Sequence, residues 1–121
     1  MKGTKNFKAT EFRCKCPICK LQVPHKMDPL VLEKVQELRD LYGAPLSLTS
    51  AYRCDKHPEE VKKEKPGQHN AGLAVDIRVT DGAMRMKLVE LGLKLGATGV
   101  GVAKTFIHLD WRKSTPVLFV Y

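Results

Sequence analysis

An alternating stretch near the middle of the chain most constrains what this sequence can fold into. Its polar-face positions are Ala74, Asp76 and Arg78, and the apolar side chains between them are those of Leu73, Val75, Ile77 and Val79. An alternation of period two is typical of a β-strand with one buried face. The stretch 73–79 therefore predicts a strand that packs on a core and carries a carboxylate on its opposite face.

One helix is predicted before this strand in the sequence and another after it. Residues 29–42 carry apolar side chains at helical spacing, with Asp28 as a suitable N-cap and Gly43 as a natural stop. A second helix is predicted over about 82–95, with Asp81 as its N-cap and a glycine at its end. Both helices have one apolar side, so both should pack on a shared core.

The remaining elements favour an α+β domain. Further strands are predicted over 46–50, 100–102, 106–111 and 117–121. Residues 54–68 hold two prolines and many charges, which is typical of a surface loop. Because helices and strands do not alternate regularly, we expect a single domain over 1–121, with helices packed on one side of a mainly antiparallel sheet.

Composition and charge narrow the classes of partner. Apolar residues make up 43% and charged residues 28%, as in an ordinary folded protein. The net charge of +8 favours anionic partners. The lysines are spread along the chain and aromatics are only 7%, so we expect no nucleic-acid partner. No apolar run approaches the roughly 20 residues that span a bilayer, so we expect no membrane association.

Two histidines and two aspartates form the pattern that carries chemistry. His69 lies in the loop that enters the strand of Asp76, and Gly72 allows that loop to turn tightly. His108 lies within a later predicted strand, and Asp110 projects to the same face. Two imidazoles and one carboxylate with an open fourth position suit a hydrolytic zinc ion, whose bound water has a pKa near about 7. The alternative is that these residues bind no metal, the histidine in the strand being a hydrogen-bonded core residue and the aspartate a solvated one.

The chain resembles the M15 peptidases, the group of D-alanyl-D-alanine carboxypeptidases and L-alanoyl-D-glutamate endopeptidases, and is most similar to their short phage-type members. The matching segments run in family order over 7–16, 38–46, 49–57, 69–77 and 106–110. The resemblance implies a fold like that of the DD-peptidases and the hedgehog signalling domain. It also implies zinc on His69, Asp76 and His108, and an Arg53 that faces the cleft to bind a substrate carboxylate or an oxyanion.

The activity that the resemblance implies is zinc-dependent hydrolysis of amide bonds in peptidoglycan stem peptides, by a carboxypeptidase or an endopeptidase. The partner is then a peptidoglycan peptide or cell-wall fragment, and we expect a monomer. No apolar run follows the basic start of the chain, so we expect no signal peptide. Synthesis in the cytoplasm is therefore expected, with action at the cell wall after release or carriage by a virion.

The general base departs from the family pattern. Relatives place an acidic residue or a histidine where this chain has Thr105 and Phe106, neither of which can take a proton. Asp110 is the candidate base on the correct strand face. Its alternative role is to hydrogen-bond and hold His108 or Arg53. A catalytically inactive zinc-binding structural or binding module of the same fold, such as a phage virion component, is the alternative function.

The four cysteines suggest a second metal site. Cys14, Cys16 and Cys19 lie in one short stretch and Cys54 lies alone. Together they could hold a structural zinc ion as four thiolates. A reducing cytoplasm disfavours disulfides, yet free thiols and a disulfide formed after release stay open as alternatives.

Overall fold

The computed structural model describes residues 2–19, 22–63 and 67–121. Its strands form one sheet in the order β1-β2-β4-β3-β5. The strands are β1 (Leu48–Ser50), β2 (Ala74–Arg78), β3 (Gly99–Val102), β4 (Phe106–Asp110) and β5 (Val117–Val120). All neighbouring strands are antiparallel except β3 and β5, which are parallel. The predicted α+β class and mainly antiparallel sheet are confirmed.

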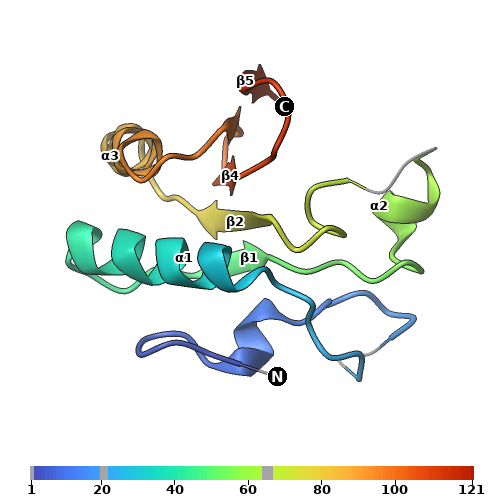
Figure 1. Cartoon of the computed structure of the whole chain (residues 1–121). Coiled ribbons are helices and arrows are strands. Elements are labelled where there is room, and N and C mark those ends of the chain that lie inside the picture. Colours follow the sequence, from blue (N-terminus) through green and yellow to red (C-terminus); the bar gives the residue numbers. More distant parts are fainter. Residues whose placement is uncertain (1, 20–21, 64–66) are drawn as a thin grey trace.

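Two long helices cover the apolar side of this sheet (Figure 1). Helix α1 (Pro29–Tyr42) contacts α3 (Gly82–Lys94), and α3 packs on β4. The contact with β4 is close, because a Cβ on Gly92 would meet the side chain of Leu109. The predicted caps are confirmed, since Asp28 accepts a hydrogen bond from the backbone of Leu30, and Asp81 accepts one from Met84.

The central strands have one apolar and one polar face. The side chains of β2 and β4 that reach the core are fully buried, namely Val75, Ile77, Ile107 and Leu109. Alternate positions carry Asp76 on β2 and His108 and Asp110 on β4 to the opposite side. The alternation predicted from the sequence is therefore confirmed, although the strand is 74–78 rather than 73–79.

Other boundaries differ modestly from the predictions. The first strand is Leu48–Ser50 rather than 46–50. The predicted loop over 54–68 includes a short helix, α2 (Pro58–Val61), and its residues 64–66 lie outside the described part of the chain. This helix forms because the His57 side chain accepts a hydrogen bond from the backbone of Glu59 and a proline follows as the first helical residue.

The N-terminal segment lies along the bottom of the view in Figure 1, below α1 and β1. It contains a 3-10 turn, η1 (Ala9–Phe12), and buries Phe7 and Phe12 in the core. The backbone N–H of Tyr52 donates to the carbonyl of Phe12 at 3.1 Å, so this segment is attached to the chain that follows β1. Among the described residues, no helix is long and apolar enough to cross a membrane.

Candidate metal centre

Asp76 and His108 are direct cross-strand partners on the two central strands. Their Cα atoms pair in the register of β2 and β4. The Oδ1 atom of Asp76 lies 3.1 Å from Nδ1 of His108, and both side chains are only 4% exposed. The sheet itself therefore positions two of the three predicted ligands, without any loop contribution.

His69 reaches the same point from the loop before β2. The loop turns at Gly72, whose φ of 77° favours glycine and where a Cβ would also collide with the carbonyl of Lys26. This brings Nε2 of His69 to 3.2 Å from Oδ1 of Asp76. The other ring nitrogen, Nδ1, lies 2.7 Å from the carbonyl oxygen of Ala51. Since a carbonyl only accepts, Nδ1 carries a proton, and Nε2 faces Asp76, where it can hold either a proton or a metal ion.

The same reasoning applies to His108. Its Nε2 lies 2.7 Å from Oδ2 of Asp110, so Nε2 keeps a proton, and Nδ1 faces Asp76, where it can hold either a proton or a metal ion. Three acceptor atoms, from His69, Asp76 and His108, thus face one point, and these ligand atoms lie within 4.8 Å of one another. Ligands about 2.0–2.1 Å from a tetrahedral zinc ion stand roughly 3.3 Å apart, close to the separations here. The donor set fits a zinc ion.

A proton can occupy the point between Asp76 and the two histidine rings in place of a metal ion. Burial alone would raise the pKa of Asp76, but hydrogen bonds with His108 and His69 outweigh burial and hold the pKa below its usual range. Burial would lower the pKa of His108, but hydrogen bonds with Asp110 and Asp76 outweigh it and raise the pKa. The cluster therefore stabilises a positive charge at its centre.

Asp110 lies behind His108. It is fully buried, and Arg112 donates to it through Nε at 2.9 Å and Nη2 at 2.6 Å, while the Arg112 backbone N–H donates to Oδ1 at 3.1 Å. Both carboxylate oxygens are thus engaged. Gly99 on β3 faces this carboxylate, and a Cβ there would collide with it. The sequence pattern correctly predicted that Asp110 shares a strand face with His108.

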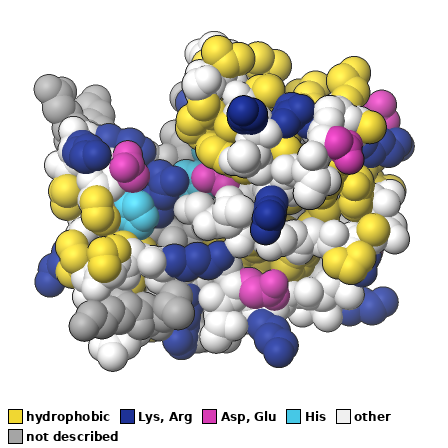
Figure 2. Space-filling model, turned by 180° about the vertical axis from the view of Figure 1, so that it is seen from behind, with side chains coloured by type: hydrophobic (Ala, Val, Ile, Leu, Met, Phe, Trp, Pro, Cys, Tyr) yellow, Lys and Arg dark blue, Asp and Glu magenta, His cyan; other side chains and the backbone are white. Residues whose placement is uncertain are grey.

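An open cleft lies over the ligand cluster. It has a volume of about 530 Å³. Its lining residues are Arg53, Glu59, Lys63, Gly67, Gln68, His69, Asp76, Phe106, His108, Arg112, Phe119 and Tyr121. Figure 2 shows this side of the molecule hollowed between two raised parts, where histidine, acidic and basic side chains meet. The cleft thus places the group of His69, Asp76 and His108 between cationic and aromatic walls.

Arg53 lies at the edge of the cleft, beside the ligand cluster. Its Nη2 atom is 3.7 Å from Oδ2 of Asp76 and its Nη1 atom is 3.5 Å from Oε2 of Glu60. Its Nε donates to Oγ of Ser50 at 3.3 Å. The Arg53 side chain is 18% exposed, so the cation is held in place and still reaches the cleft.

Sequence reasoning missed Glu60. A glutamate in a charged loop reads as solvated, yet Glu60 is buried. It accepts hydrogen bonds from the backbone of Gly67 at 2.9 Å and from Nζ of Lys63 at 3.0 Å, besides its contact with Arg53. Burial would raise its pKa, but these partners outweigh burial and lower it. No local pattern reveals this role, because the chain between Arg53 and Gly67 must fold back on itself to bring these partners around Glu60.

Sequence reasoning also missed the aromatic wall formed by β5. Phe119 pairs in register with Gly101 of β3, and a Cβ on Gly101 would collide with its ring. The Phe119 ring centroid lies 5.2 Å from that of His108, and Tyr121 packs on Phe106 at 4.8 Å. A usable pattern was present, because aromatic residues alternate in 117–121 while glycines alternate in 99–101.

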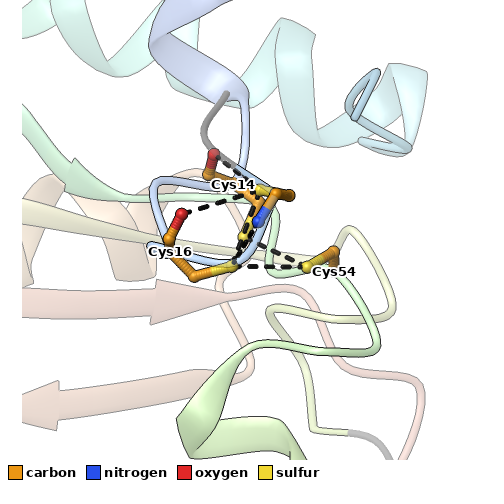
Figure 3. A group of neighbouring side chains, drawn as sticks. Cys14, Cys16 and Cys54 are labelled. Atoms are coloured by element: carbon orange, nitrogen blue, oxygen red, sulfur yellow. Dashed lines mark hydrogen bonds between the residues drawn. The ribbon is translucent and has the colours of Figure 1, made fainter. Parts of the chain in front are cut away.

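The four predicted cysteines also lie together. Figure 3 shows Cys14, Cys16 and Cys54 pointing toward one another. Cys14 and Cys54 have sulfur atoms 3.5 Å apart, and Cys16 lies 3.6 Å from both Cys19 and Cys54. None is in a disulfide. Burial raises the pKa of Cys14 to about 12. Burial would also raise the pKa of Cys16, but hydrogen bonds, first from the Cys19 backbone, outweigh it and lower the pKa to about 7.

Comparison with known proteins supports the resemblance found in the sequence. A family model described as Peptidase M15 matches residues 5–110, which is most of the chain. The matched span contains both side-chain groups that could hold a metal ion. No curated protein matches the chain.

Proposed function

The chain belongs to the M15 peptidase family, and from that premise we propose that it is a zinc-dependent peptidase that hydrolyses amide bonds in peptidoglycan stem peptides. The observation that carries this proposal is the convergence of three acceptor atoms, His69 Nε2, Asp76 Oδ1 and His108 Nδ1, at an open cleft. Such a set holds a metal ion with three protein ligands and leaves a position for water.

Those three atoms would hold the ion, and a zinc ion there supplies an activated water and polarises the carbonyl of the scissile amide. The rings of His69 and His108 are fixed by the Ala51 carbonyl and by Asp110, respectively. Fixed rings keep the ligand lone pairs aimed at the ion position. The residues present therefore do the orienting that this chemistry needs.

The walls of the cleft suit an anionic peptide. Arg53, Lys63 and Arg112 bring cationic groups to the lining. Arg53 is already held between Glu60 and Asp76, so its guanidinium can bind a substrate carboxylate or a developing oxyanion without large reorganisation. Stem peptides carry free carboxylates, which supports this substrate class over a neutral peptide.

The geometry favours the second of the two roles considered for Asp110. Its two oxygens are occupied by His108 and Arg112, and it is fully buried behind the ring. We therefore assign it to holding His108 in one tautomer. Among the described residues that line the cleft, Glu59 is the carboxylate outside the ligand set; its side chain is 56% exposed and pairs with Lys62, and we propose it as the group that accepts a proton from water.

The test is digestion of purified peptidoglycan fragments with zinc-loaded protein. New amino or carboxyl termini, identified by mass spectrometry, would identify an endopeptidase or a carboxypeptidase. The matched control is His108→Ala, which removes a ligand and should abolish cleavage. Equal product from the wild type and this variant would contradict the proposal.

One observation favours a second candidate, a zinc-binding module of the same fold without peptidase activity. The positions that supply a base in relatives hold Thr105 and Phe106, and Asp110 is fully engaged, which leaves the exposed Glu59, paired with Lys62 at 3.5 Å, as the carboxylate at the cleft. A zinc-loaded protein that binds cell-wall fragments but cleaves none, across several wall chemistries, would support such a role, for example in a phage virion.

A further inference from the structure

The cysteine group has the dimensions of a four-sulfur metal site. Two contacts join Cys16 to Cys19 and Cys54 at 3.6 Å, and one joins Cys14 to Cys54 at 3.5 Å. Zinc–sulfur bonds of about 2.3 Å in a tetrahedron place the sulfurs roughly 3.8 Å apart. A disulfide needs about 2.05 Å, so these thiols are gathered but not bonded in pairs.

Burial of the sulfurs disfavours thiolates, but backbone donors aimed at the sulfurs and a bound cation offset this cost. Cys14, Cys16 and Cys54 are buried. The backbone N–H of Cys19 points at the Cys16 sulfur at 3.5 Å, and backbone hydrogen bonds from Cys54 and Cys16 reach the Cys14 sulfur. A neutral thiol is a weak acceptor, so donors aimed at sulfur are more useful to a thiolate.

The net charge of the surroundings also favours this ligand set. Four thiolates and one divalent cation leave a charge of −2 at the site. Lys26, Lys56 and Asp55 line the hollow beside Cys19 and Cys54, so the two lysines outnumber the one carboxylate and partly offset that charge. Four sulfur ligands select zinc among the common divalent ions of the cell, and a full set of protein ligands leaves no position for a substrate.

We propose that Cys14, Cys16, Cys19 and Cys54 bind one zinc ion in a closed site, and that this ion holds the segment 51–54 on which the orientation of His69 depends. Figure 3 shows Cys54 meeting Cys14 and Cys16 from a separate part of the chain. The ion would therefore join the N-terminal segment to the chain that follows β1.

The connection to His69 is short. The segment after β1 is held on one side by the cysteines and by the hydrogen bond from Tyr52 to Phe12. On its other side, the Ala51 carbonyl accepts from Nδ1 of His69 at 2.7 Å, and the Arg53 backbone N–H donates to the His69 carbonyl at 3.3 Å. Release of Cys54 would free the segment that orients His69 and presents Arg53.

The first experiment uses the wild-type protein, purified without added metal and then loaded with zinc. The expected result is about two zinc ions per chain and four thiols that react with a thiol reagent only after a strong chelator is added. Cobalt substitution should add an intense sulfur-to-metal absorption band. Four thiols that react at once, two disulfides by mass spectrometry, or iron in place of zinc would each overturn the proposal.

This experiment separates the proposal from the proposed function. If the histidine site binds no metal, the wild type should still hold one zinc ion with protected thiols. If the cysteine site binds none, the His108→Ala variant should hold no zinc, whereas the wild type holds one. Zinc content and thiol protection in these two proteins therefore test the cysteine proposal independently of the histidine site.

The second experiment tests the link to His69, and it rests on the proposed metal at the histidine site. Cys19→Ser is the mildest variant, because Cys19 is the only partly exposed thiol of the four. We expect a loss of one zinc ion and a fall of roughly tenfold or more in zinc affinity at the histidine site. Val35→Ala, a buried change in α1, controls for general destabilisation. Equal affinity at the histidine site in Cys19→Ser and wild type would refute the link.

Discussion

The Nε2 atom of His108 lies 2.7 Å from Oδ2 of Asp110, whereas its Nδ1 atom faces Asp76 at 3.1 Å. One ring thus contacts two carboxylates through different nitrogens. The contact with Asp110 keeps a proton on Nε2, whereas Nδ1 can hold either a proton or a metal ion between itself and Asp76. This relationship makes His108 a preset ligand, and it leads to the first two predictions.

Removing either histidine ligand should remove one metal ion. His69→Ala and His108→Ala each delete one of three acceptor atoms that converge on Asp76, so zinc content should fall by about one equivalent per chain. Elemental analysis of the purified variants measures this. His25→Ala is the control, since His25 bonds the carbonyl of Lys2 and belongs to neither metal group. Full zinc content in both ligand variants would disprove the site.

Asp110→Asn should weaken zinc binding more than it slows cleavage at saturating zinc. The amide keeps the shape but loses the charge that fixes the His108 tautomer, so zinc affinity should fall about 10–100-fold. A chelator competition assay measures the affinity. A general base would behave differently, with intact affinity and a loss of about 10²–10⁴ in rate. Glu59→Gln, tested in parallel, should show that second pattern.

Gly99→Ala should also weaken zinc binding, although it changes none of the three ligand residues. The new Cβ would collide with the Asp110 carboxylate and displace it from His108. We expect lower zinc affinity together with lower thermal stability. Gly96→Ala is the matched control: its φ of 88° makes alanine strained by about 1 kcal/mol, but nothing lies near its Cβ. Affinity should be unchanged in that control, and equal affinity in both variants would contradict the argument.

Glu60 predicts a pH dependence of stability. Its pKa in the folded protein lies below the ordinary value of 4.5, because Gly67, Lys63 and Arg53 outweigh its burial. A lowered pKa contributes stability that is present above about pH 4.5 and is lost as pH falls through the folded value. Glu60→Gln should therefore be less stable than wild type at neutral pH, and the difference should shrink on acidification. Denaturant unfolding at several pH values measures it, and a pH-independent difference would count against this role.

Much of the fold follows from local patterns. The helix over 29–42 was predicted with its observed boundaries, because its N-cap, its proline and its terminal glycine are local features. The faces of β2 followed from alternation alone. The histidine and cysteine groups were also predicted, since residue types and spacing identify candidate ligands. The prediction that ligands distant in the sequence lie together rested on the family resemblance as much as on spacing.

What escaped prediction depends on side-chain geometry and on how loops and strands fold back on one another. The burial of Glu60 comes from a loop folding back to Gly67 and from Arg53 across it. The parallel pairing of β5 with β3, which brings Phe119 beside His108, needs a crossover that no residue pattern specifies. The engagement of Asp110 by Arg112 likewise required the side-chain geometry. These contacts decide the role of Asp110, and so the sequence left two roles open.

The three ligands at the histidine site differ in how they are held. Asp76 and His108 belong to paired central strands, whereas His69 belongs to a loop that turns at Gly72. Capture of an ion should therefore begin at the strand pair and end with the loop, and its escape should begin with His69. The residence time of the ion is then governed by loop opening rather than by sheet stability. A variant that loosens this loop should speed metal exchange well before it lowers the melting temperature.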